Sequence, residues 1–193
     1  MRAGFPLSPD VIARYFTGRR PADMFAEVEI ASGRKLPPNF AATVASVILR
    51  RFRSELRATH HAEYALSWLR GPKCVASSSS HERIRVSLES TGLIRSFDEN
   101  LFSASDVRKG KPAPDLFLHT AGRLNVQPST CIVVEDSPVG VAAGVAAGMT
   151  VIGFVGGSHA DNKLGDHLRS AGARAVISDL RALKSTIIDL RGW

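Results

Sequence analysis

The spacing of apolar residues changes near residue 72 and divides the chain into two parts. Before that point apolar side chains recur every three or four positions, which is the spacing of one face of an α-helix. Serine or proline at the start of such a stretch and glycine at its end are the usual boundary residues. We therefore expect helices at 9–16, from Pro21 to Gly33, and twice between Phe40 and Leu69, with a break near Thr59–His61.

After residue 72 short apolar runs alternate with helical stretches. The expected strands are 74–76, 101–103, 131–134, 151–155 and 175–178. The expected helices are 81–90, 114–123, 138–147, 162–170 and 180–190. Strands that alternate with helices of this length form a parallel sheet with helices on its faces. We therefore expect an α/β core at 71–193 behind a helical domain at 1–70, with the functional groups at the carboxyl ends of the strands.

The composition is that of a packed globular protein, with 44% hydrophobic and 22% charged residues. The sequence has no apolar run of the roughly 18 residues that a membrane span requires. Its first residues lack the apolar stretch of a secretory signal. Two cysteines, Cys74 and Cys131, are too few for a disulfide framework and are typical of a reducing compartment. We therefore expect a cytoplasmic protein with no membrane partner.

The formal net charge is +7, from 25 Lys and Arg against 18 Asp and Glu. A basic surface attracts anions, either nucleic acid or small molecules. The arginines are scattered among helical positions, without the interleaved aromatic residues of a nucleic-acid-binding surface. Solvated helix faces explain most of them, and we expect no nucleic-acid partner.

Four consecutive serines, Ser77–Ser80, follow the first expected strand and precede the helix that begins near His81. Hydroxyls beside free backbone N–H groups at a helix start can cradle a phosphate. Serine is also the ordinary N-cap of a helix, and alone this pattern indicates no more than that. The serine run therefore leaves two interpretations, a phosphate cradle and a helix cap.

Two adjacent carboxylates, Glu135 and Asp136, follow the third expected strand. Like charges this close are unfavourable unless a cation lies between them, and carboxylate oxygens suit Mg²⁺. The next helix is rich in Gly and Ala, so we expect it to approach the sheet closely. Lys111 precedes a proline in a loop that fixes its ammonium group in place. The strand ends are therefore expected to gather hydroxyls, carboxylates and an ammonium group.

Ser77, Lys111 and the pair Glu135-Asp136 together resemble the haloacid dehalogenase superfamily. Two phrases look like its branch of β-phosphoglucomutase and the sugar-phosphate phosphatases: Gly110-Lys111-Pro112-Ala113-Pro114-Asp115 and Val134-Glu135-Asp136-Ser137-Pro138-Val139-Gly140. The resemblance is strong over 72–180 and weak over 8–70, which look like the helical cap of that branch. It implies a Rossmann-like parallel sheet with a helical cap at 1–70, Mg²⁺ as cofactor and a small phosphorylated metabolite as partner.

The resemblance also implies a role for each of these residues. Ser77 would hydrogen-bond the transferring phosphoryl group, and Lys111 would stabilise its charge and orient the nucleophile. Glu135 and Asp136 would hold Mg²⁺. The further substrate-binding residues that we expect are Ser78, Ser79, Arg19 and Arg20. The two arginines lie in a loop that looks like the substrate-reading loop of the cap, although arginines in such a turn are often simply solvated.

The family's first motif, Asp-x-Asp-Gly at the end of its first core strand, has no match, because no Asp-x-Asp occurs in the 193 residues. In the family the first Asp attacks phosphorus and the second is the general acid and base. That strand lies between those ending at Ser77 and Glu135, so we expect a gap there. A misassigned start, a truncated gene and a genuine short form are three explanations. We favour the first two because the later motifs are intact.

The resulting hypothesis is a Mg²⁺-dependent phosphohydrolase of a small phosphorylated metabolite, specifically a sugar phosphate, which acts through an aspartyl-phosphate intermediate in the complete protein. The chain of 193 residues is expected to bind phosphate without turning it over. A β-phosphoglucomutase-like isomerase and a catalytically inactive phosphate-binding or interaction protein remain alternatives.

Overall fold

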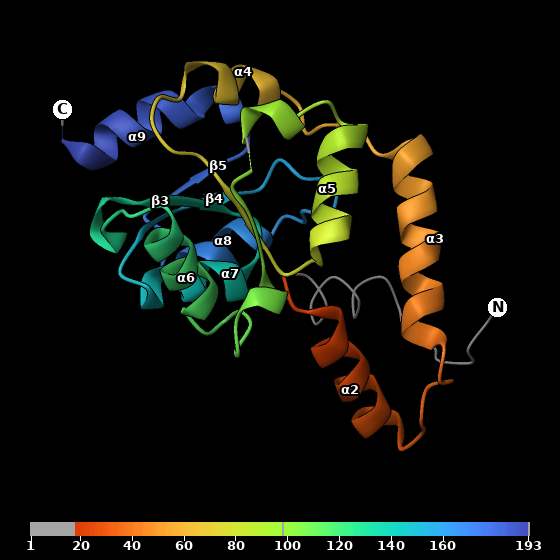
Figure 1. The fold of residues 1–193 in the computed structure, drawn as a ribbon. Coiled ribbons are helices and arrows are strands. Elements are labelled where there is room, and N and C mark those ends of the chain that lie inside the picture. Colours follow the sequence, from red (N-terminus) through yellow and green to blue (C-terminus); the bar gives the residue numbers. More distant parts are fainter. Residues whose placement is uncertain (1–17, 98, 193) are drawn as a thin grey trace.

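Parallel strands and the helices around them form the core (Figure 1). The computed structural model describes residues 18–97 and 99–192. The strands are β1 (Val75–Ser77), β2 (Leu101–Ser103), β3 (Ile132–Glu135), β4 (Thr150–Phe154) and β5 (Ala175–Ile177). The helices are α4 (Ala62–Trp68), α5 (His81–Ser90), α6 (Asp115–Arg123), α7 (Pro138–Ala146), α8 (Leu164–Ser170) and α9 (Leu183–Arg191), with single 3-10 turns η1 (Ile94–Ser96), η2 (Ala104–Asp106), η3 (Pro128–Thr130) and η4 (Leu180–Ala182). The elements expected after residue 72 are all confirmed, with boundaries shifted by at most three residues, whereas the expected helix at 9–16 lies outside the described residues.

Two helices, α2 (Pro21–Ser32) and α3 (Phe40–Glu55), extend to one side of the core and form the cap (Figure 1). Gly33 ends α2 with a φ of 63°, a left-handed conformation that glycine adopts without strain. The rings of Phe25 and Phe40 pack edge to face, 5.4 Å between centroids, and join the two helices. Within 18–97 and 99–192, no helix has both the length and the apolar content to cross a membrane.

The sheet of the core is divided in two. β1 pairs with β2, and β3, β4 and β5 follow one another in a second sheet, all pairs being parallel. Ala76 of β1 packs on the hydrophobic cluster that contains Val133 of β3, so these two strands face each other. In the part of the chain that the structure describes, no strand pairing joins them. The expected parallel α/β fold is therefore confirmed, and within the described residues its strands form two separate sheets.

Helix α7 lies close against β3 and β4, as its Gly and Ala content predicts. Val141 and Ala143 on its inner face are fully buried. A Cβ atom at Gly144 would lie 2.7 Å from Val151 Cγ2 of β4, so a larger residue would push the helix away from the sheet. This contact allows α7 to pack closely on β4, next to the strand β3 that ends at Glu135.

The expected cap at 1–70 includes α4, but α4 packs on the core beside α9 (Figure 1). Ala65 is 3% exposed and belongs to one hydrophobic cluster with Ile152 and Ile177. At the start of α4, His61 Nδ1 lies 3.0 Å from Asp179 Oδ1 in the loop after β5. Helical spacing is the same in cap and core helices, so the sequence could not show on which part α4 packs. We propose that the cap ends before α4, in the connection at 56–61, rather than at residue 70.

Candidate functional site

Lys111 lies between the ends of the two sheets. Lys111 is 8% exposed, and its Nζ donates a hydrogen bond to the Ala76 carbonyl of β1 at 3.3 Å. The same ammonium group forms an ion pair and hydrogen bond with the Glu135 carboxylate of β3. It also lies 4.9 Å from the centroid of the Phe117 ring. A buried ammonium group is tolerated only when it is paired in this way, so the protein holds Lys111 in one place.

Glu135 is the centre of a buried polar network. One carboxylate oxygen accepts from Lys111, and the other accepts from Ser137 Oγ at 3.1 Å. Ser137 Oγ in turn accepts from the Gly140 N–H at 3.1 Å, at the start of α7. A Cβ atom at Gly140 would overlap the Glu135 carboxylate, so glycine is required there. Roles for Ser137 and Gly140 were not predicted from the sequence, although their positions just after the carboxylate pair at the start of a helix could have indicated them.

Asp136 is the accessible member of the carboxylate pair. Its side chain is 48% exposed, and its Oδ2 lies 3.5 Å from His159 Nε2 in the loop after β4. The described residues contain no cluster of three or more His, Cys, Asp or Glu side chains arranged to hold a metal ion. Mg²⁺ keeps several waters and needs only one or two carboxylates from the protein. The exposed carboxylate of Asp136, next to the buried carboxylate of Glu135, therefore fits Mg²⁺ by its donor chemistry.

The serines of the run Ser77–Ser80 make different hydrogen bonds. Ser80 caps α5, because its Oγ accepts from the Arg83 N–H at 3.4 Å. Ser77 Oγ accepts from the Ser79 N–H at 3.1 Å, and in the described part of the chain its own hydroxyl proton has no acceptor. Ser78 Oγ donates to the Gly18 carbonyl at 2.6 Å. The helix cap is thus supplied by Ser80, which leaves the Ser77 hydroxyl available to an anion at the end of β1.

The two cap arginines are placed differently. Arg19 pairs with Glu27 of α2. The Arg20 guanidinium pairs with Asp23, with Nε 2.8 Å from Oδ2, and also donates from Nη1 to the Arg108 carbonyl at 3.3 Å. A Cβ atom at Gly110, next to Lys111, would lie 2.8 Å from Arg20 Nε. Arg20 therefore reaches the loop that carries Lys111, whereas Arg19 is engaged within the cap.

Gly18 brings the beginning of the cap against the strand ends. A Cβ atom at this position would overlap Ser137, which bonds to Glu135. Its φ is 81°, a conformation that other residues rarely adopt. Together with the hydrogen bond from Ser78, this contact places the segment 18–20 directly over the ends of β1 and β3.

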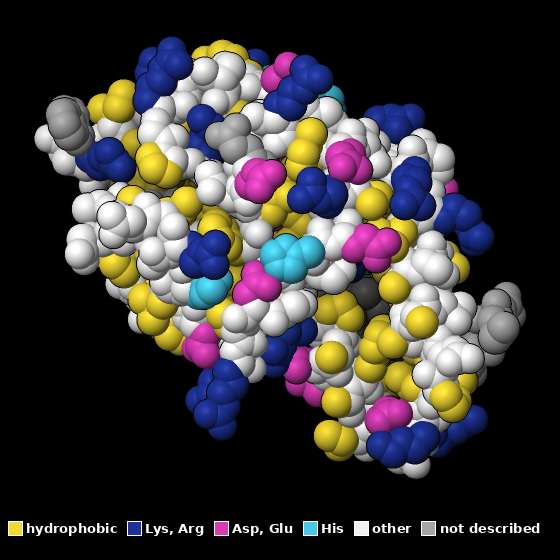
Figure 2. Space-filling view, viewed as in Figure 1, with side chains coloured by type: hydrophobic (Ala, Val, Ile, Leu, Met, Phe, Trp, Pro, Cys, Tyr) yellow, Lys and Arg dark blue, Asp and Glu magenta, His cyan; other side chains and the backbone are white. Residues whose placement is uncertain are grey.

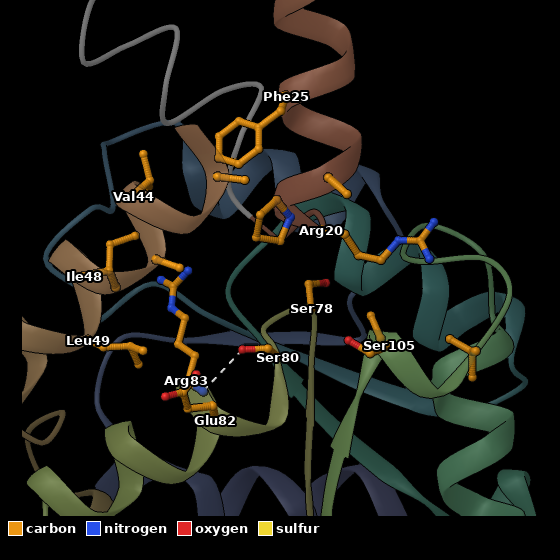
Figure 3. Close-up of a pocket in the computed structure, with 16 residues that line it drawn as sticks. Arg20, Phe25, Val44, Ile48, Leu49, Ser78, Ser80, Glu82, Arg83 and Ser105 are labelled. Carbon is orange, nitrogen blue, oxygen red and sulfur yellow. Dashed lines mark hydrogen bonds between the residues drawn. The ribbon is translucent and has the colours of Figure 1, made fainter. Parts of the chain in front are cut away.

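A cavity of about 480 Å³ lies between the cap and the core. Figure 2 shows a hollow with hydrophobic side chains beside it on the α2–α3 side of the molecule. The core contributes polar residues from the ends of β1 and β2, among them Ser78 and Ser105 (Figure 3). Neither this cavity nor Arg83, which lines it, was predicted from the sequence. The signal available was weak, namely an arginine in the first turn of the helix after the serine run.

Comparison with known proteins agrees with the fold and the strand-end motifs. The haloacid dehalogenase-like hydrolase family matches residues 10–148. The 6-phosphogluconate phosphatase of Escherichia coli (strain K12) is 32% identical over 157 residues, which cover 81% of this chain and 71% of that protein. The validoxylamine A 7'-phosphate phosphatase of Streptomyces hygroscopicus subsp. limoneus is 30% identical over 156 residues, which cover 79% of this chain and 72% of that protein.

Among solved structures, a conserved haloacid dehalogenase-like protein of unknown function from Agrobacterium tumefaciens superposes with a TM-score of 0.82. It is 34% identical, and the match covers 98% of this chain and 86% of that chain. A match of this length in sequence and in fold confirms the resemblance that Ser77, Lys111 and the pair Glu135-Asp136 indicate. The chain belongs to the haloacid dehalogenase-like hydrolases.

Proposed function

We propose that this protein is a Mg²⁺-dependent phosphatase of a small sugar phosphate. The observation that carries the proposal is the position of Lys111, a buried ammonium group that contacts β1 and β3 at the edge where Ser77 and Asp136 also lie. The phosphatases of Escherichia coli and Streptomyces hygroscopicus, which are 32% and 30% identical to this chain over the matched residues, support the same class of reaction.

Each group has a distinct task in this proposal. Ser77 donates its free hydroxyl proton to a phosphoryl oxygen, and Lys111 stabilises the negative charge that develops during transfer. Ser78 adds its backbone N–H group at the same strand end, and the Ser79 N–H, which donates to Ser77 Oγ, holds the Ser77 hydroxyl in place. Asp136, with Glu135 behind it, would hold Mg²⁺, which neutralises phosphoryl charge when it is bound. Glu135 also keeps the Lys111 ammonium group in position.

The cap completes the substrate site. Arg20 lies beside the loop that carries Lys111, so its guanidinium borders the group of Ser77, Lys111 and Asp136 on the side of the cap. Both arginines have an acidic partner, Glu27 for Arg19 and Asp23 for Arg20, but only Arg20 also contacts the loop that carries Lys111, at the Arg108 carbonyl. We therefore assign substrate binding in the cap to Arg20 rather than to both arginines.

The nucleophile is the remaining requirement. Transfer through an aspartyl phosphate needs a carboxylate aimed at phosphorus, and the sequence has no Asp-x-Asp. β1 and β3 each have one edge without a strand partner in the described part of the chain. We propose that the complete enzyme carries the nucleophile on a strand between them, and that the 193 residues alone bind phosphate without hydrolysing it.

Two further assignments follow from the composition. Cys74 and Cys131 are both free thiols, which suits a reducing cytoplasm. The small cavity and the strand-end groups suit a small metabolite rather than nucleic acid, because nucleic-acid sites present extended basic surfaces.

The test compares this chain with a version extended at its N-terminus by an Asp-x-Asp-Gly strand. Phosphate release from a panel of sugar phosphates is measured with Mg²⁺ and with EDTA. We expect turnover by the extended chain alone, its loss in EDTA, and its loss in Asp136→Ala. Product analysis separates hydrolysis from isomerisation of the sugar phosphate, which would favour a mutase. Turnover by the short chain would contradict the assignment of the nucleophile, and a folded but inactive extended chain would favour a non-catalytic phosphate-binding protein.

A further inference from the structure

A guanidinium group without a carboxylate partner projects into the cavity between cap and core. Arg83 lies in the first turn of α5, and its side chain extends from that helix toward α3 (Figure 3). In the described part of the chain its guanidinium takes part in no ion pair and no hydrogen bond, although its backbone N–H bonds to Ser80. Its Cζ atom lies 5.2 Å from the centroid of the Phe52 ring. Among the described residues, the positive charge of Arg83 is therefore left without a contacting counter-charge.

The cavity wall around Arg83 is apolar on the cap side. Phe25, Val44, Ile48 and Leu49 line that wall (Figure 3). Burial lowers the pKa of Arg83, because withdrawal from water disfavours the charged form. Arginine nevertheless stays protonated in proteins. Such a desolvated cation is stabilised strongly when an anion joins it, because a low local dielectric strengthens their attraction.

The other charged residues of the cavity do not neutralise Arg83. Glu82 lines the cavity, but it makes no ion pair with Arg83, both residues being described. Arg20 is neutralised by Asp23, and its guanidinium points away from Arg83 (Figure 3). Among the described residues, the Arg83 guanidinium thus has no ion-pair partner at the end of the cavity where α5 meets α3.

We propose that the substrate carries a second anionic group, a carboxylate or a further phosphate, and that Arg83 binds it. The inference rests on the proposed function and adds a specificity-determining residue to it. Ser78 lines the cavity and follows Ser77 directly, so a metabolite whose reacting phosphate lies at the strand ends extends into the cavity. A volume of about 480 Å³ is sufficient for such a metabolite.

The test measures binding by isothermal titration calorimetry of the 193-residue chain in a buffer with Mg²⁺. The ligands are glucose 6-phosphate, 6-phosphogluconate, which adds a carboxylate, and glucose 1,6-bisphosphate, which adds a phosphate. We expect one of the doubly anionic ligands to bind at least about tenfold more tightly than glucose 6-phosphate, since a charge-assisted hydrogen bond contributes that much. The ligand that is preferred identifies the second group.

The variants are Arg83→Gln and a matched control, Arg85→Gln, which removes an exposed arginine of the same helix that does not line the cavity. We expect Arg83→Gln to abolish the preference and to leave the affinity for glucose 6-phosphate unchanged. Arg85→Gln should keep the preference. Phe52→Leu removes the ring contact of Arg83 and should lower the melting temperature without removing the preference.

The outcomes separate the two proposals. If glucose 6-phosphate binds but the wild type has no preference, or if Arg83→Gln keeps the preference, the inference about Arg83 is wrong and the proposed function stands. If Arg83→Gln weakens all three ligands equally, Arg83 has only a structural role and the inference is again wrong. If the wild type binds none of the phosphate esters, the proposed function and the inference fail together.

Discussion

The ammonium group of Lys111 and the carboxylate of Glu135 form a buried ion pair between β1 and β3, with side chains that are 5% and 8% exposed. The pair joins two sheets that share no strand pairing in the described part of the chain. It therefore has a structural task as well as the catalytic one that we propose.

Removal of one partner of this pair should be costly. Lys111→Met leaves the Glu135 carboxylate buried without a counter-charge, and we expect the free energy of unfolding to fall by about 3–5 kcal/mol. The double variant Lys111→Met/Glu135→Gln should recover part of that loss, because no buried charge remains. Urea unfolding measures the free energy of unfolding of the single and the double variant, and Lys109→Met is the exposed control in the same loop. A loss in Lys111→Met no larger than in Lys109→Met would show that the pair does not stabilise the fold.

Two glycines in helices should respond in opposite directions to alanine. Gly140→Ala places a methyl group against the Glu135 carboxylate, and we expect a loss of about 1–3 kcal/mol in the free energy of unfolding. Gly122 lies in α6, and an added Cβ would have no atom within 4 Å apart from its chain neighbours and the backbone of its own helix, so Gly122→Ala should stabilise by about 0.5–1 kcal/mol. Denaturant unfolding of the two variants side by side checks the contrast. Equal effects would mean that the start of α7 adjusts freely to the added methyl group.

The Cys74 thiol should react slowly with alkylating reagents. Burial, together with the nearby Cys131, raises the pKa of Cys74 to about 11. In a Cys131→Ser variant, the iodoacetamide rate at Cys74 should rise about tenfold for each pH unit from 8 to 10 and level off near pH 11, because only the thiolate reacts. Mass spectrometry of quenched samples gives the rates. A plateau near pH 9 would show that the thiol is accessible to water.

The raised pKa of Cys74 also makes the free energy of unfolding depend on pH. An unfolded cysteine ionises near its ordinary pKa of about 8.5, whereas the folded thiol stays neutral up to about pH 11. The contribution of Cys74 to stability is therefore fully present below about pH 8.5 and is lost as the pH rises toward 11. Cys74→Ser should remove that part of the alkaline decline in unfolding free energy.

The packing of α4 on the core can be tested with a polar substitution. Ala65→Gln buries an amide among Ile152, Ile177 and Leu183, and we expect a loss of about 2 kcal/mol or more in the free energy of unfolding. Ala42→Gln, at an exposed position of α3, is the matched control and should change it little. If both variants unfold like the wild type, α4 does not belong to the core.

The sequence predicted the strand ends well because the elements there are short and local. Val133 and Val134 precede Glu135 in a β-branched run, and the proline after Lys111 fixes its loop, so both residues could be placed without knowledge of the fold. That Lys111 and Glu135 meet was expected from the rule that functional groups gather where parallel strands end, at one edge of the sheet. The family match then confirmed the fold that these positions indicated.

The parts that the sequence did not predict depend on contacts between distant segments. Arg83 becomes distinctive only because α3, more than 25 residues earlier, supplies Ile48 and Leu49 to the wall beside it. Ala65 looks like any small residue of a cap helix until Ile152 and Ile177 pack on it. Periodicity records which face of a helix is apolar, but it does not record which partner covers that face.

The unpaired edges of β1 and β3 have a consequence for the exchange of backbone hydrogens with solvent. Successive peptide groups of a strand point to opposite sides within the sheet, and Val75 directs its N–H to Asn100 beside β2. The amide of Ala76 therefore points toward β3, where no strand of the described residues accepts from it. Deuterium should enter this position and the alternate amides of β3 as readily as at the border of a sheet, although they lie at the centre of the domain.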